Sequence, residues 1–110
     1  MLYISVDDFF KKANNTTRLS REDEKAYALK MRDGDAEARN KIIGCYLPLA
    51  ASYIKRLPKE LQTLEAVYAF IDSLEKGVDS FNFFQSGETF IHHLSFRFRQ
   101  CTTRLIANRY

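Results

Sequence analysis

The sequence has few cysteines and few glycines, and their positions do not fit a disulfide framework or a phosphate-binding loop. Cys45 lies inside an apolar run and Cys101 on an apolar helix stripe, so we expect both to be reduced core residues. The four glycines are scattered at positions 34, 44, 77 and 87, where each fits a helix end or a turn. The sequence therefore predicts neither a disulfide-stabilised protein nor a glycine-rich nucleotide loop.

Long apolar runs and alternating patterns are also missing. No apolar run approaches the roughly 18 residues that a membrane span needs, and no basic segment followed by an apolar stretch resembles a signal peptide. We therefore expect a cytoplasmic protein. Because no segment alternates with a period of two, the predicted fold class is all-α: one domain of 110 residues, built as a compact bundle of four to five helices.

The polar residues form no catalytic arrangement. Acids at positions 22 to 24 are explained by helix capping and by the helix dipole. His92 and His93 are adjacent, so on a helix they point about 100° apart, and no cysteine or carboxylate cluster accompanies them as in a metal site. We therefore expect a binding protein without metal or cofactor, and not an enzyme.

Capping residues divide the chain into helices. The predicted helices run over residues 6–14 after Ser5, 21–32 after Ser20, from 36 after Asp35, and 64–76 after Thr63. Gly77 is the predicted end of the last of these. Pro48 should interrupt the third helix, so we expect it to reach about Gly44, to kink near residues 45–47, and to continue as a buried stripe to Leu57.

The last helical stretch, residues 88–108, has two different faces. One is an apolar stripe that we expect to be buried, made of Phe90, Ile91, Leu94, Phe98, Cys101 and Leu105. The other places an aromatic ring among cations and polar groups: His92, His93, Phe96, Arg99, Gln100, Thr103 and Arg104, with Arg97 at its edge. A surface that follows phosphates and stacks an unpaired base needs this mixture, so the face predicts nucleic-acid binding. A basic, solvated face with Phe96 packed under the loop of Phe83 and Phe84 is the alternative.

The charge distribution favours the same helix. The chain has 17 Lys and Arg against 14 Asp and Glu, a net charge of +3. Residues 1–85 hold thirteen of each sign, whereas residues 86–110 hold four arginines and only Glu88. The net positive charge is therefore concentrated on the terminal segment, as expected for a surface that meets a polyanion.

Four segments, taken in order, carry a resemblance to a known family. They are residues 19–24 (Leu-Ser-Arg-Glu-Asp-Glu), 34–43 (Gly-Asp-Ala-Glu-Ala-Arg-Asn-Lys-Ile-Ile), 47–56, and 79–108, which includes Arg99-Gln100-Cys-Thr-Thr103-Arg104. Together they resemble region 2, with an adjoining region 1.2-like segment, of bacterial RNA polymerase sigma factors of the sigma-seventy class. The resemblance is divergent. It covers residues 19–109 and leaves residues 1–18 as an N-terminal extension.

The resemblance implies a transcription initiation module. Such a module binds a coiled coil in the largest subunit of core RNA polymerase and recognises or melts the promoter −10 element, as duplex and as single strand. The positions that match the family's DNA contacts are Phe90, His93, Phe96, Arg97, Arg99, Gln100, Thr103 and Arg104. Phe96 and Arg97 replace the family's paired tryptophans, and only Phe96 keeps a stacking plane.

The resemblance also implies a polymerase-binding helix, with departures from the family. Its predicted contacts are Leu64, Glu65, Tyr68, Asp72 and Glu75. Glu65 keeps the family's acidic character, whereas Tyr68 replaces a polar residue. At residues 46–49, Tyr-Leu-Pro-Leu stands where many sigma factors have a polar run that lines a base pocket.

These departures leave a second function class open. It is a protein-interaction module, an accessory subunit or a decoy, on a degenerate sigma scaffold that does not open DNA. The family's separate domain for the −35 element has no counterpart in these residues, so two further readings stay open. The chain is a fragment, or a partner supplies −35 recognition.

Overall fold

The computed structural model describes residues 3–16, 18–81 and 89–109. Its helices are α1 (Val6–Asn14), α2 (Arg21–Arg32), α3 (Ala36–Lys55), the short 3-10 helix η1 (Lys59–Leu61), α4 (Leu64–Ser80) and α5 (Phe90–Arg109). No strand occurs in these residues, so the predicted all-α bundle is confirmed. Within the same residues, no helix has both the length and the apolar character to cross a membrane.

The predicted caps begin four of these helices. In each, the capping side chain accepts a hydrogen bond from the backbone N–H three residues later, at 3.1 Å for Ser5, Ser20 and Asp35 and 3.2 Å for Thr63. These bonds satisfy N–H groups that have no partner inside the helix. A cap also begins the fifth helix, because the Thr89 hydroxyl accepts from His92 N–H at 3.3 Å.

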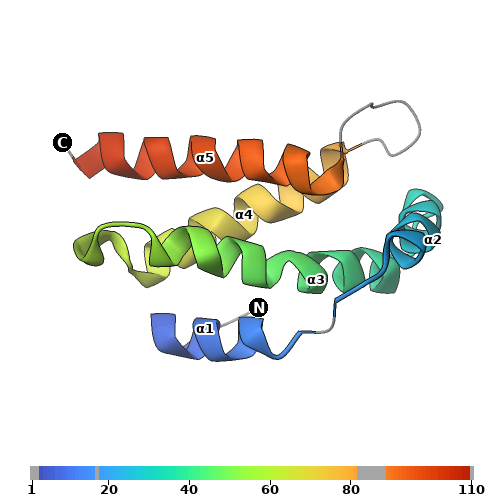
Figure 1. The fold of residues 1–110 in the computed structure, drawn as a ribbon, viewed down its shortest axis with the longest axis horizontal. Helices are drawn as coiled ribbons and strands as arrows, with labels where there is room; N and C mark the ends of the chain where they lie inside the picture. The colour runs from blue at the N-terminus through green and yellow to red at the C-terminus, as the bar shows by residue number, and fades with distance from the viewer. Residues whose placement is uncertain (1–2, 17, 82–88, 110) are drawn as a thin grey trace.

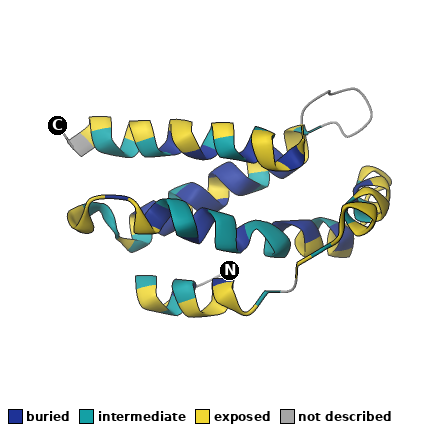
Figure 2. Cartoon of the chain, viewed as in Figure 1, coloured by how far each residue is buried: buried dark blue, intermediate teal, exposed yellow. Residues whose placement is uncertain are grey.

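Helix α3 lies at the centre of the bundle. Figure 1 shows α1 along one side of α3, α4 and α5 on the other, and α2 at one end. The core is formed where the inner faces meet, and the outer faces carry the exposed residues (Figure 2). Aromatic rings of α3, α4 and α5 meet there: Tyr53, Phe70 and Phe98 lie with ring centroids 5.4 to 6.3 Å apart.

The prediction that the third helix ends near Gly44 is wrong. One helix, Ala36–Lys55, contains both Gly44 and Pro48. A proline inside a helix costs about 3 kcal/mol, but buried apolar residues lie on both sides of it, including Ile42 and Leu47 before it and Ile54 after it. Each buried side chain of this size contributes about 1.5–3 kcal/mol, so their burial outweighs the cost of Pro48.

The prediction that Gly77 ends α4 is also wrong, because the helix continues to Ser80. Gly77 is buried where α5 crosses. A Cβ at this position would lie 2.6 Å from Leu94 Cδ2 and 3.2 Å from Arg97 Cδ. Gly77 therefore permits the close approach of α4 and α5, and this approach sets the geometry of the surface described next.

Candidate nucleic-acid interface

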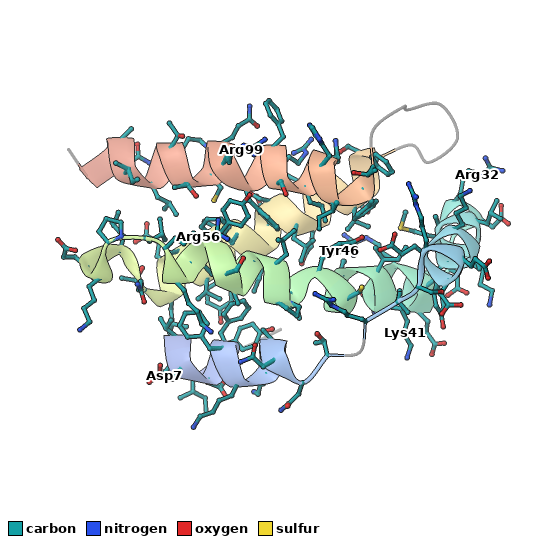
Figure 3. The ribbon with its side chains drawn as sticks, viewed as in Figure 1. Asp7, Arg32, Lys41, Tyr46, Arg56 and Arg99 are labelled. Atoms are coloured by element: carbon teal, nitrogen blue, oxygen red, sulfur yellow. The ribbon has the colours of Figure 1, made fainter. Side chains whose placement is uncertain are left out.

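A groove of about 620 Å³ lies between α4 and α5. Its α5 wall is formed by Phe96, Arg97, Arg99, Gln100, Thr103 and Arg104, and its α4 wall by Asp72, Ser73 and Lys76. Six of the eight residues predicted to contact DNA therefore line one groove. Figure 3 labels Arg99 on α5, the uppermost helix of this view.

The groove lining is cationic. Arg97, Arg99 and Arg104 on α5 and Lys76 on α4 are accompanied by one carboxylate, Asp72. The Lys76 ammonium lies 3.0 Å from the Asp72 carboxylate, and both side chains are more than half exposed. Among the described residues, the three arginines form no ion pair. Their charges are thus available to an anionic ligand.

Phe96 provides an exposed aromatic surface at this groove. Its exposed fraction is 53%, which is unusual for a phenylalanine. The alternative in which Phe83 and Phe84 cover it concerns residues outside the described part of the chain. The position of Phe96 is suited to stacking on an unpaired base.

Arg97 and His93 meet at the end of α4. Arg97 donates from Nη2 to the Ser80 hydroxyl at 3.2 Å, and His93 Nε2 lies 3.2 Å from the same oxygen. The His93 ring also lies 5.2 Å from the Phe81 ring. His93 does not line the groove. His93 is half-buried and precedes Phe96 by about one turn, nearer the start of α5.

Phe90 does not lie on the predicted DNA surface. It is 3% exposed, with its ring stacked on Tyr46 at 4.9 Å and in edge contact with Phe81 at 4.9 Å. Burial of this ring in the core corrects its assignment as a DNA contact. The prediction for Ile91 is also wrong: this residue was expected in the buried stripe, and its side chain is 51% exposed.

Tyr46 of α3 contacts both α5 and α2. It lies on the side of α3 that faces α5 (Figure 3), and its hydroxyl donates to the Glu24 carboxylate of α2. Burial, and then the hydrogen bond and charge of Glu24, raise the pKa of Tyr46. The phenol therefore stays protonated and holds α2 against α3.

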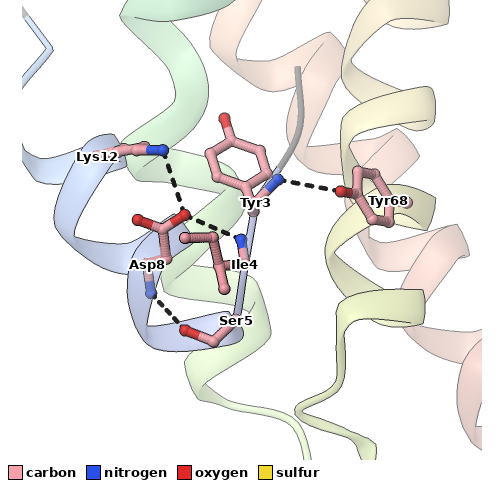
Figure 4. A network of polar contacts seen from close by, with 6 residues as sticks. All are labelled: Tyr3, Ile4, Ser5, Asp8, Lys12 and Tyr68. Atoms are coloured by element: carbon pink, nitrogen blue, oxygen red, sulfur yellow. Dashed lines mark hydrogen bonds and ion pairs between the residues drawn. The ribbon is translucent and has the colours of Figure 1, made fainter.

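The predicted polymerase contacts lie on α4. Glu65 and Asp72 are exposed, Leu64 and Glu75 half-buried. Tyr68 is 38% exposed, and its hydroxyl accepts a hydrogen bond from Tyr3 N–H at 3.1 Å (Figure 4). The segment before α1 thus covers part of this helix face.

An ion pair joins α3 to the end of α4. Arg39 donates to both carboxylate oxygens of Asp79, at 2.7 and 3.0 Å, and lies 3.9 Å from Glu75. The Arg39 guanidinium lowers the pKa of Asp79. Glu75, a predicted polymerase contact, therefore shares its nearest cation with Asp79.

Sequence reasoning missed the α4 wall of the groove. Ser73 and Lys76 were not among the predicted contacts, and Asp72 was assigned to polymerase binding alone. The spacing of Asp72 and Lys76 by one helical turn was visible in the sequence. That α5 would lie beside them was not.

Comparisons with known protein families, curated proteins and solved structures find no match to this chain. The functional assignment of the groove therefore depends on its own residues.

Proposed function

We propose that this chain is a transcription initiation module that binds core RNA polymerase and recognises or melts the promoter −10 element. The observation that carries the proposal is the groove between α4 and α5, where four cations and an exposed aromatic ring accompany one carboxylate. Arginines hold phosphates, Phe96 offers a face to an unpaired base, and Gln100 can hydrogen-bond an adenine edge. Stacking contributes about 1–3 kcal/mol per base, comparable to the cost of unstacking it.

The polymerase part of the proposal concerns the side of α4 that carries Glu65, Tyr68 and Asp72, of which Asp72 also lines the groove. Glu65, Tyr68 and Asp72 are separated by three and four residues, which places them on one side of a helix. Glu65 and Asp72 are exposed. An acidic, partly aromatic face of this kind is suited to a basic partner surface, and the family resemblance implies that this partner is the polymerase coiled coil.

Two observations favour a second candidate, an accessory or decoy module that binds a protein partner without opening DNA. Tyr46 places a bulky ring at a position that matches the family's base pocket, and its hydroxyl is hydrogen-bonded to Glu24. Tyr3 and the segment around it cover part of Tyr68 on the polymerase-binding face. The first observation removes space for a flipped base, and the second reduces the area of Tyr68 that a polymerase could contact.

The polymerase proposal is tested by retention of core RNA polymerase on the immobilised protein. Glu65→Arg reverses a charge on the exposed face of α4 and should release the enzyme. The matched control is Glu37→Arg on α3. Both residues lie in the first turn of a helix, so both substitutions have the same unfavourable interaction with the helix dipole.

Retention by the wild type and by Glu37→Arg, with loss in Glu65→Arg, supports docking through α4. If the wild type retains no polymerase, the polymerase part of the proposal is wrong. If polymerase is retained but single-stranded −10 DNA is not bound by the complex, the accessory module is the better description.

A further inference from the structure

The groove has two walls, and only one of them was expected to contact a ligand. Lys76 on α4 lies across from the arginines of α5, and Asp72 holds its ammonium at 3.0 Å. This ion pair is exposed and lies within one helix, the kind that contributes little to stability. Replacement of the Asp72 carboxylate by another anion at the Lys76 ammonium therefore costs little free energy.

The directions of the α5 arginines indicate where an anionic chain would lie. Arg97 and Arg104 are seven residues apart, so they occupy the same side of the helix, and both line the groove with α4. Arg97 is directed to the end of α4 by its hydrogen bond to Ser80. Phosphates held by this pair would lie between the helices, next to Lys76, and not on the outer surface of α5.

We propose that a single strand of DNA lies along the groove between α4 and α5. In this arrangement Lys76 contacts a phosphate, and the Asp72 carboxylate competes with that phosphate for the Lys76 ammonium. Phe96, exposed at the groove, is in a position to stack one base. In the free protein, the Asp72 carboxylate forms an ion pair with the Lys76 ammonium, and its negative charge repels phosphate. This inference depends on the nucleic-acid part of the proposed function and adds the path of the strand.

The test is fluorescence anisotropy with an A/T-rich single-stranded DNA of about 12 nucleotides, a length within the range that single-strand binding domains cover. Affinity is measured over a series of salt concentrations. Lys76→Gln should weaken binding about 5-fold at 0.1 M salt and lower the salt slope by about 0.7, the contribution of one phosphate contact. Asp72→Asn should tighten binding. Lys25→Gln, on the exposed surface of α2 and away from the groove, is the control and should change neither.

Two reference variants separate the possible failures. If Arg104→Gln and Phe96→Ala weaken binding while Lys76→Gln and Asp72→Asn leave it unchanged, the strand crosses the outer face of α5 and this inference is wrong. Weaker binding by Asp72→Asn also contradicts it, because the carboxylate would then be a contact. If all four variants bind as the wild type does, or the wild type does not bind, the nucleic-acid proposal itself fails.

Discussion

Gly77 of α4 lies against Leu94 of α5 so closely that a Cβ on Gly77 would come within 2.6 Å of Leu94 Cδ2. Leu94 is fully buried and has little room to move. The absence of a side chain at Gly77 thus permits the close approach of the two walls of the groove.

Gly77→Ala should therefore destabilise the protein by up to about 2 kcal/mol. Alanine is favoured over glycine inside a helix by about 1 kcal/mol, but overpacking a filled core costs about 1–3 kcal/mol. Gly44→Ala is the matched control, since Gly44 is also inside a helix and a Cβ there would meet nothing within 4 Å. It should stabilise by about 0.5–1 kcal/mol. Urea denaturation measures both, and an equal effect of the two substitutions would contradict the close contact.

Phe96→Ala should weaken binding of single-stranded DNA by about 1–3 kcal/mol, or about 5- to 150-fold, by removing a stacking surface. The melting temperature should hardly change, because the ring is 53% exposed. Ile91→Ala is the control: Ile91 is an apolar residue of α5 that is 51% exposed and does not line the groove. Equal losses from the two variants, measured by anisotropy, would show that general apolar surface and not stacking matters.

The pair of Arg39 and Asp79 should make stability depend on acid pH. Arg39 lies in the first turn of α3 and Asp79 near the end of α4, so each charge is unfavourable to its own helix dipole and is offset by the other. A double-mutant cycle with Arg39→Gln and Asp79→Asn isolates their coupling, about 0.5–1 kcal/mol at pH 7 for an exposed pair.

The sign of this pH dependence follows from the lowered pKa of Asp79. Its contribution is complete above the unfolded pKa of about 3.9 and is lost as pH falls through the lower folded value. The coupling should therefore decline as pH falls below about 3.9, as measured by urea denaturation. A coupling that persists there would contradict the ion pair.

Tyr46→Phe should destabilise the protein by about 1 kcal/mol, because it leaves the Glu24 carboxylate without its donor. The raised pKa of Tyr46 gives a second test at alkaline pH. Its contribution is complete below the unfolded pKa of about 10 and declines as pH rises above it. The wild type should lose stability faster than Tyr46→Phe above pH 10. Parallel losses would show that the phenol is not held by Glu24.

Local patterns in the sequence were enough to predict much of the fold. Ser5, Ser20, Asp35 and Thr63 each cap the helix that was expected, because a cap is decided by residues within one turn. The polar face of α5 was likewise visible in its helical period. The prediction for Gly77 was wrong because a glycine can either end a helix or allow a second helix to pack closely against it. Only the position of α5 distinguishes these two roles.

The candidate site was predictable only on one side. The residues of α5 could be chosen from their spacing, but Lys76 became relevant only when α4 was found beside them. At the first turn of α5, Phe90 was expected both in the buried stripe and as a DNA contact and is buried, whereas Ile91 was expected in the stripe and is exposed. Phe90 is buried against Tyr46 and Phe81, and the helical period of α5 does not include these contacts.

The central claim is that one chain docks on polymerase through α4 and holds an unpaired DNA strand beside α5. The most direct measurement is capture of core RNA polymerase on a fork DNA with an unpaired −10 strand, by the wild type, Glu65→Arg and Phe96→Ala. The account predicts capture by the wild type, loss of polymerase from Glu65→Arg, and loss of the DNA complex from Phe96→Ala with polymerase binding kept. Failure of the wild type to bring polymerase and this DNA together would contradict the account.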